Sequence, residues 1–318
     1  MDFRLTADQS ALVEAIDKLA GQFEAKPTEF RGFALPGGAL DKELEDGQYF
    51  DIAQVPELGA VCAAMAVERL ARLPCATEVA LSMLVRPQLA GEWPRPLAVV
   101  ENGRPGRFVA TAGTILLIEG EDIRVVRTAA GDTEPVDSLF AYPMGRWKGR
   151  AEISPLSGER SANVRKWLRI ALAAEASGLL QAALASAVDH LTQRKQFGRP
   201  LGSFQALRHR MAECAVLAGG VRWLALKAAD TAEPGDAALA AMHAQESATR
   251  IVYDVHQMLG AMGMTLEHPL HLWTYRLKAL LSELGGRGGQ ALAVAAECFA
   301  GKDRITAVPW AARGPAPQ

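Results

Sequence analysis

The connection between two long apolar segments decides the fold of this chain, and residues 193–205 of it read QRKQFGRPLGSFQ. It offers a guanidinium from Arg194, an aromatic ring from Phe197 and an amide from Gln205. The helix that follows begins with free N–H groups, which favour anions, so the stretch suits a diphosphate. A solvated turn between two helices would carry the same residues, and the residues alone favour that plainer interpretation.

Both sides of this connection are expected to be helical. Apolar residues recur with helical spacing over residues 164–194 and 203–229, and again over 236–260, 269–284 and 289–300. A second segment, QMLGAMG at residues 257–263, ends one of these helices with Gly260 and Gly263, where a ligand can approach the backbone closely. A helix cap followed by a tight turn explains these glycines equally well, and better in isolation.

The chain before residue 158 shows two other patterns. Thr6 and Gln9 fit a capping box that opens an amphipathic helix, and helical periodicity continues with breaks to about residue 73. Short β-branched runs at 97–101, 108–111, 115–119 and 123–127 predict an antiparallel meander or a small barrel. We therefore expect a mainly α fold with a small β domain: helices at 1–93, β domain at 94–157, bundle at 158–306 and tail at 307–318.

Composition narrows the classes of partner and compartment. A net charge of −2, with one local basic cluster at Arg194, Lys195, Arg199, Arg208 and Arg210, predicts no nucleic-acid surface. The four cysteines and six histidines show no metal-ligand spacing, so we expect buried thiols, a reducing compartment and no metal. The N-terminus lacks a secretory pattern, which predicts the cytoplasm.

One apolar stretch, residues 170–188, raises the question of a membrane span. Glu175, Ser177, Gln181 and Ser186 interrupt it, and such groups are costly in lipid. We expect a buried, alanine-rich core helix and no membrane partner. Common hydrolase, zinc-protease, Walker and dinucleotide-fold motifs are also missing from the sequence.

The two glycine-containing segments, taken together and in this order, resemble the C-terminal domain of the acyl-CoA dehydrogenases, and residues 1–9 resemble that family's N-terminus. The resemblance implies an N-terminal helical domain, a middle β domain, a C-terminal four-helix bundle and FAD bound between two subunits. Carried over by position, Arg194, Phe197 and Gln205 would contact the FAD diphosphate. Gln257, Gly260 and Ala261 would contact the adenine and ribose, although the family usually has glycine at position 261.

The family also needs a glutamate that removes an α-proton from the acyl-CoA while FAD takes a hydride. The two positions that carry this base in the family correspond here to Gly285 and Leu168, neither of them an acid. Glu283 is the only weak candidate, through an alignment shift of two residues. Arg169 corresponds to an arginine that contacts CoA, whereas Glu175 replaces a small residue of the helix that lines the acyl cavity.

The β domain is shortened and lacks the segments that cradle the flavin ring in full members of the family. The chain therefore resembles the smaller subunits of bacterial α2β2 acyl-CoA dehydrogenases of steroid side-chain catabolism. By that resemblance, a second acyl-CoA dehydrogenase subunit would supply the base and acyl pocket, while this chain completes the FAD site. Two alternatives stay open: a homomeric flavin oxidoreductase that uses Glu283, and a non-enzymatic dimerisation subunit that has lost FAD.

Overall fold

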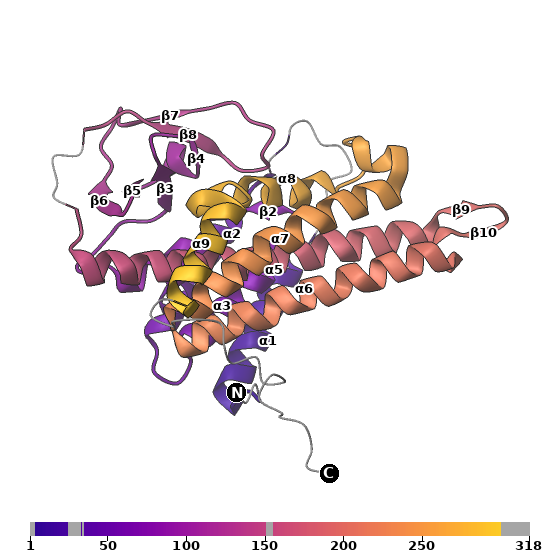
Figure 1. The fold of residues 1–318 in the computed structure, drawn as a ribbon, viewed down its shortest axis with the longest axis horizontal. Coiled ribbons are helices and arrows are strands. Elements are labelled where there is room, and N and C mark those ends of the chain that lie inside the picture. Colours follow the sequence, from indigo (N-terminus) through magenta and orange to yellow (C-terminus); the bar gives the residue numbers. More distant parts are fainter. Residues whose placement is uncertain (1–3, 25–32, 34, 151–154, 300–318) are drawn as a thin grey trace, which may run out of the picture.

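The computed structural model describes residues 4–24, 33, 35–150 and 155–299, so the predicted tail at 307–318 lies outside the described residues. Figure 1 shows N-terminal helices, a small β region and a long helical bundle, which confirms the predicted fold class. The hairpin between the two longest bundle helices projects at one end of the molecule, and the β region lies toward the other end (Figure 1).

The N-terminal region is a set of short helices around a buried apolar helix. Thr6 closes the predicted capping box: the Gln9 N–H donates to Thr6 Oγ1 at 3.3 Å and the Thr6 N–H to Gln9 Oε1 at 3.1 Å. The elements are α1 (Ala7–Gly21), β1 (Leu35–Pro36), α2 (Gly38–Asp46), η1 (Tyr49–Gln54), α3 (Gly59–Ala71), β2 (Cys75–Ala76), α4 (Ala80–Leu84) and η2 (Arg86–Gln88).

The β region differs from the predicted meander. Its strands are β3 (Leu97–Glu101), β4 (Gly106–Arg107), β5 (Thr114–Glu119), β6 (Asp122–Arg127), β7 (Thr133–Pro135) and β8 (Met144–Trp147), in two sheets ordered β3-β5-β6 and β4-β8-β7. β3 pairs with β5 in parallel. The predicted strand at 108–111 is wrong, because Phe108 adopts a left-handed φ of 62° and the 3-10 turn η3 (Val109–Thr111) follows. That turn lets β5 return beside β3 in the same direction.

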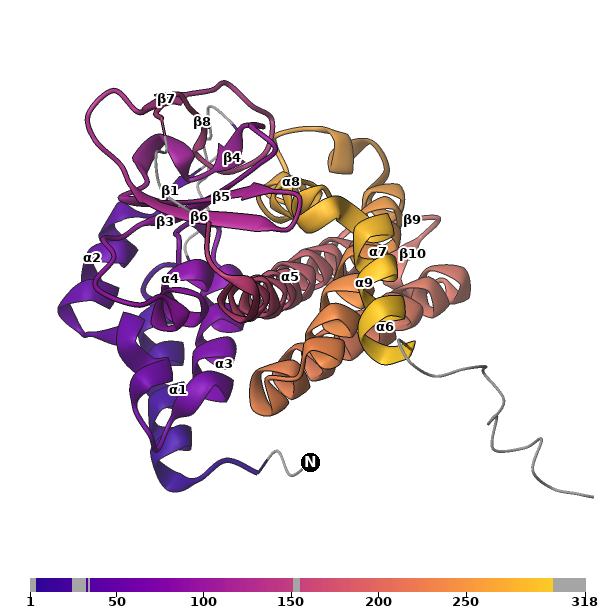
Figure 2. The same cartoon turned by 60° about the vertical axis from the view of Figure 1, so that its left-hand side comes forward.

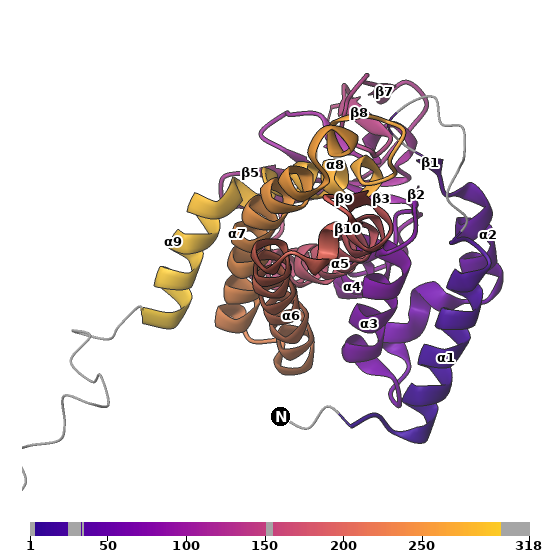
Figure 3. The same cartoon turned by 90° about the vertical axis from the view of Figure 1, so that its right-hand side faces the viewer.

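The C-terminal bundle is built around one long helix. Its elements are α5 (Gly158–Gln193), β9 (Lys195–Gln196), β10 (Arg199–Pro200), η4 (Leu201–Ser203), α6 (Gln205–Thr231), α7 (Pro234–Leu259), η5 (Gly260–Met264), α8 (His271–Leu280), η6 (Glu283–Gly285) and α9 (Gly286–Phe299). Figure 2 shows α5 between the N-terminal helices and the rest of the bundle, and Figure 3 shows α9 on the outside against α7.

The helix α5 is long and apolar enough to cross a membrane by length and composition alone. Inside the fold, however, 83% of its most apolar window is buried by the neighbouring helices. The polar side chains that interrupt it find partners there: Ser177 donates to Glu68 at 3.3 Å, and Glu175 pairs with an arginine of the β region at 2.7 Å. The helix is therefore accounted for as the core of the bundle.

Glycine 178 allows α5 to approach α3 closely. A Cβ atom at this position would lie 2.1 Å from the Glu68 carbonyl oxygen and 2.8 Å from the Ala71 Cβ atom. Arg222 of α6 contacts the same turn of α3, because its Nε donates to both Glu68 carboxylate oxygens at 3.2 and 3.1 Å. Replacing the hydrogen of Gly178 by a methyl group must push the two backbones apart.

We predict that Gly178→Ala destabilises the protein by about 1–3 kcal/mol, because overpacking outweighs the better helix propensity of alanine. The matched control is Gly219→Ala in α6, where nothing lies within 4 Å of the added Cβ. That control should gain about 0.5–1 kcal/mol. Denaturant unfolding of the two variants measures the difference. Equal stability of the two variants would contradict a close α3–α5 contact at Gly178.

Candidate functional site

The connection at 193–205 folds into a small hairpin that extends beyond the bundle. β9 and β10 pair antiparallel, and the two loop residues Phe197 and Gly198 have φ values of 54° and 78°, as a type I′ turn requires. The Leu201 N–H donates to the Arg194 carbonyl at 2.8 Å and closes the hairpin at its base. Phe197 is 88% exposed at the tip. Its side chain is thus presented to the surroundings rather than to the core of this chain.

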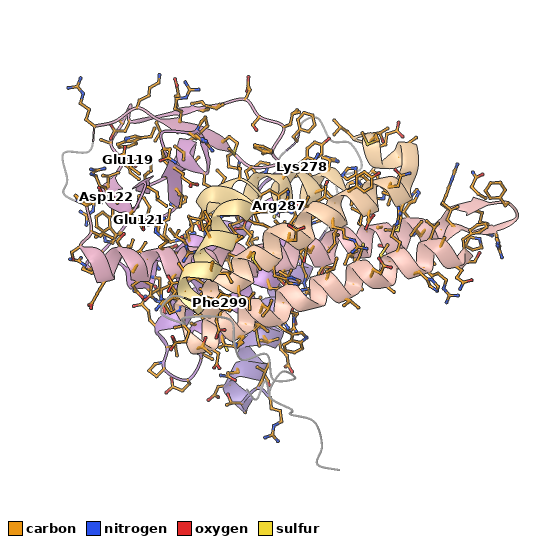
Figure 4. All side chains as sticks on the ribbon, viewed as in Figure 1. Glu119, Glu121, Asp122, Lys278, Arg287 and Phe299 are labelled. Carbon is orange, nitrogen blue, oxygen red and sulfur yellow. The ribbon has the colours of Figure 1, made fainter. Side chains whose placement is uncertain are left out.

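The predicted diphosphate ligands all lie on this exposed end. Arg194 follows the last residue of α5, and Gln205 is the first residue of α6; both side chains are exposed. Within the described residues Arg194 makes no ion pair, whereas the acidic β5–β6 turn with Glu119, Glu121 and Asp122 lies toward the opposite end of the molecule (Figures 1 and 4). The Arg194 guanidinium therefore has no acidic partner among the described residues.

The second predicted segment lies where α7 gives way to η5. Gly260 has φ 60° and ψ −136°, a conformation open essentially to glycine, and nothing lies within 4 Å of where its Cβ would be. Gln257, Gly260 and Ala261 are all exposed. A cavity of about 580 Å³ opens beside them, lined by Thr249, Val252, Tyr253, His256, Gln257, Gly260, Met264, Tyr275, Lys278 and Leu281. Figure 4 labels Lys278 on α8 at this site.

A contact between two histidines brings the two predicted FAD-contacting segments together. The rings of His190, near the end of α5, and His268, which follows η5, meet edge to face at 5.4 Å. Burial and then the charge of Arg194 lower the pKa of His190, which places that guanidinium near the same contact. The structure thus brings the two predicted ligand segments to the same end of the bundle, although they are about sixty residues apart in sequence.

The positions where the family places its base hold no acid. Leu168 is buried in α5, and Gly285 lies in a turn where Leu284 takes a left-handed φ of 54°. Three side chains hold this turn. The Leu284 N–H donates to Glu101 at 2.8 Å, Gln245 Nε2 donates to the Glu283 carbonyl at 3.0 Å, and Gln290 Nε2 donates to the Leu284 carbonyl at 2.7 Å.

The predicted CoA contact, Arg169, belongs to the same arrangement. Its Nε donates to Gln290 Oε1 at 3.1 Å, and Gln290 in turn supports the Leu284 carbonyl. Burial, followed by the charge of Arg165, lowers the pKa of Arg169. The structure therefore gives Arg169 a partner within this chain and a role in fixing the turn that contains Gly285.

Behind this turn lies a buried ionic cluster of Arg107, Tyr142, Glu175 and Glu283, here called the Arg107 cluster. Arg107 Nη1 donates to Glu175 at 2.7 Å and its Nε to Glu283 Oε1 at 2.6 Å. The Tyr142 hydroxyl donates to the second Glu175 oxygen at 2.6 Å. Arg107, Tyr142 and Glu175 are buried, and the Glu283 side chain is only 23% exposed. The cluster ties the β region to the bundle.

The surroundings in the Arg107 cluster favour a charged guanidinium and a neutral phenol. Burial raises the pKa of Tyr142, and Glu175 raises it further, so the hydroxyl keeps its proton and donates it. Burial opposes the charge on Arg107, but Glu175 and then Glu283 raise its pKa well above the ordinary value. Burial also raises the pKa of Glu283, and the opposing pull of Arg107 is smaller.

The sequence pointed to Glu175 and Glu283, the two acids of the Arg107 cluster, but not to Arg107 or Tyr142. A glutamate inside an apolar helix signals that a cationic partner exists, since an unpaired buried carboxylate is costly. Sequence spacing does not indicate which arginine is that partner, because Arg107 and Glu175 are 68 residues apart. Arg107 is in addition followed directly by the apolar Phe108 and Val109, which made that part of the sequence look like a strand.

Both the sequence and the fold are similar to those of known proteins. Residues 163–297 match the model of the acyl-CoA dehydrogenase C-terminal domain. The chain therefore contains a region, residues 163–297, that belongs to the acyl-CoA dehydrogenase family. The chain is 33% identical to the acyl-CoA dehydrogenase FadE34 of Mycobacterium tuberculosis over 208 residues, which are 61% of this chain and 29% of that protein. With the acyl-CoA dehydrogenase IpdE2 of the same organism it shares 38% over 107 residues, 34% of each protein.

These matches span about a third of the length of each relative. Solved structures share the fold over almost the whole chain. The ChsE4-ChsE5 complex from Mycobacterium tuberculosis superimposes with a TM-score of 0.69 at 19% identity and covers 94% of this chain and 99% of that one. The Tcur3481-Tcur3483 steroid acyl-CoA dehydrogenase superimposes with a TM-score of 0.70 at 18% identity and covers 92% of this chain and 97% of that one.

Among the described residues of this chain, no group of three or more His, Cys, Asp or Glu residues could hold a metal ion.

We predict that Arg107→Met destabilises the protein by about 3–5 kcal/mol, because it leaves two carboxylates buried without their cation. The control is Arg124→Met, which removes a surface pair with Glu119 whose acid side chain is 64% exposed, and should cost at most about 1 kcal/mol. Urea unfolding compares the variants. A cost for Arg107→Met as small as that of the control would show that the Arg107 cluster does not hold the β region to the bundle.

Proposed function

We propose that this chain is a subunit of a cytoplasmic, FAD-dependent acyl-CoA dehydrogenase that introduces an α,β double bond into a bulky acyl-CoA of the steroid side-chain type. The chain contacts the FAD diphosphate through Arg194, Phe197 and Gln205, and the adenosine side through Gln257, Gly260 and Ala261. A second acyl-CoA dehydrogenase subunit supplies the catalytic base and the acyl pocket in an α2β2 assembly.

The Arg107 cluster carries this proposal. It occupies the region between α5, the β region and the turn at Gly285, where the resemblance places base and acyl chain. Bringing a thioester tail against Glu175 would require breaking a buried ion pair, which costs several kcal/mol in general. The base and the acyl pocket are therefore better sought on another subunit.

The homomeric alternative with Glu283 as base has one observation in its favour. A carboxyl group whose pKa is raised by burial is the kind of group that general bases use. Against it, both carboxylate oxygens of Glu283 accept bonds from Arg107, at 2.6 and 3.3 Å. A carboxylate engaged in this way is poorly available for a substrate proton, so the heteromeric enzyme is the better account.

The exposed hairpin end fits the diphosphate of FAD. A guanidinium without an acidic partner, beside a helix N-terminus, pairs well with phosphate oxygens, and the bare backbone at Gly260 leaves room for a sugar or a base. When bound, FAD accepts the hydride that leaves the acyl β-carbon. The residues of this chain neutralise and orient the phosphates. A purely structural subunit without FAD would have no use for this set of residues.

The steroid-type substrate and the second subunit are supported by the structural relatives. One of them is described as a complex of two different chains, ChsE4 and ChsE5, and another as a steroid acyl-CoA dehydrogenase formed by Tcur3481 and Tcur3483. Their identity to this chain is 18–19%, so they supply the class of assembly and substrate to be tested first.

The split site predicts a stoichiometry. Purified alone, the chain should be colourless and poorly behaved, whereas co-expression with the second acyl-CoA dehydrogenase subunit should give a yellow complex with one FAD per heterodimer. Flavin absorbance together with quantitative mass spectrometry of the intact complex measures the ratio. A homogeneous lone chain that carries one FAD and desaturates an acyl-CoA would refute the heteromeric enzyme.

Removal of the proposed phosphate ligand should weaken FAD binding. Charge-assisted hydrogen bonds contribute about 1.5–3 kcal/mol, so Arg194→Ala in the assembled complex should raise the FAD dissociation constant roughly 10- to 150-fold. Arg194→Lys should give an intermediate dissociation constant, because lysine keeps the positive charge but lacks the planar, bidentate donor group of arginine. Arg146→Ala, at an exposed arginine of β8, is the control. Equal flavin content in all four proteins would leave the hairpin without a cofactor role.

The third test concerns the base. Glu283→Gln in the assembled enzyme should keep the turnover number within a few-fold, although it should lower thermal stability because Arg107 loses a charged partner. Loss of a true general base would instead cost at least ~100-fold. Turnover is compared at equal FAD content. A drop of that size with flavin fully retained would return the catalytic role to this chain.

A further inference from the structure

Phe204, which precedes α6, carries two contacts that fix the shape of the hairpin. The Phe197 and Phe204 rings meet edge to face, with centroids 6.0 Å apart and planes at 83°. The guanidinium carbon of Arg199 lies 4.1 Å from the centre of the same ring. Phe204 is itself anchored, because its N–H donates to the Leu201 carbonyl and its carbonyl accepts from the Arg208 N–H, each at 3.1 Å.

Besides these contacts and the Leu201–Arg194 hydrogen bond at its base, the hairpin is held by a short ladder. Its ladder consists of two residue pairs, Gln196 with Arg199 and Lys195 with Pro200, and an isolated two-stranded hairpin is marginally stable in water. Phe197 has a left-handed φ of 54°, which costs energy for a residue other than glycine. Its ring is 88% exposed, so the protein core does not hold it. The Phe204 ring supplies aromatic and cation–π contacts at both sides of the loop.

We propose that Phe204 is a positioning residue, which preforms the hairpin so that Arg194 and Phe197 are already arranged for an anionic, aromatic ligand before it binds. The inference rests on the proposed function, because it takes that ligand to be FAD. A ligand that must first order its own binding loop binds more weakly, in proportion to the fraction of protein already in the competent shape. Phe204 acts by keeping that fraction high.

The experiment uses the co-expressed complex, with FAD removed and then titrated back. Phe204→Leu removes the aromatic face, Phe204→Tyr retains it, and Phe299→Leu replaces an exposed ring at the end of α9 (Figure 4). Two quantities are measured: the FAD dissociation constant, and the rate of trypsin cleavage after Arg194 and Lys195 in the FAD-free complex. The second reports hairpin order without reference to the cofactor.

Phe204→Leu should raise the FAD dissociation constant ~5- to 50-fold and speed the cleavage, in line with the loss of one aromatic and one cation–π contact. Phe204→Tyr and Phe299→Leu should behave as wild type. Unchanged cleavage and affinity in Phe204→Leu would overturn the inference, and so would faster cleavage with unchanged affinity. If Arg194→Ala weakens FAD binding while Phe204→Leu does not, the proposed function is supported and the positioning role of Phe204 is refuted.

Discussion

The bridge from Arg107 to Glu175 and Glu283 is the interaction on which the rest of this structure depends. One cation of the β region is shared by two carboxylates from different parts of the bundle, with Tyr142 completing the hydrogen bonds. Such a buried set is costly to form and much more costly to leave incomplete. It therefore fixes how β4, α5 and η6 sit together.

The side chains predicted to bind FAD lie at the surface, away from this cluster. The turn at Gly285 is tied down by Glu101, Gln245 and Gln290, so it resembles a supported loop more than a catalytic one. Arg194 at the hairpin and Gln257 at the end of α7 are exposed. A fold can thus be kept while the residues at its functional positions change.

Much of this organisation could be predicted from the sequence, because it depends on local pattern. Helical periodicity located the bundle helices, and the Thr6–Gln9 capping box was confirmed atom by atom. One predicted strand and one predicted strand pairing were wrong, because local pattern was not sufficient there. Apolar residues at 108–111 read as a strand, but the left-handed Phe108 turns the chain, and the parallel pairing of β3 with β5 depends on that turn. The Arg107 cluster could not be foreseen, since its members come from four distant segments.

The most direct test of the central claim is the structure of the co-expressed complex with FAD bound, determined by electron cryo-microscopy. We expect the FAD diphosphate within hydrogen-bonding distance of Arg194, the flavin ring on the middle domain of the partner subunit, and Arg107 still bonded to both Glu175 and Glu283. A flavin ring held on the β region of this chain, with Glu283 released from Arg107 and directed at the substrate, would contradict this expectation.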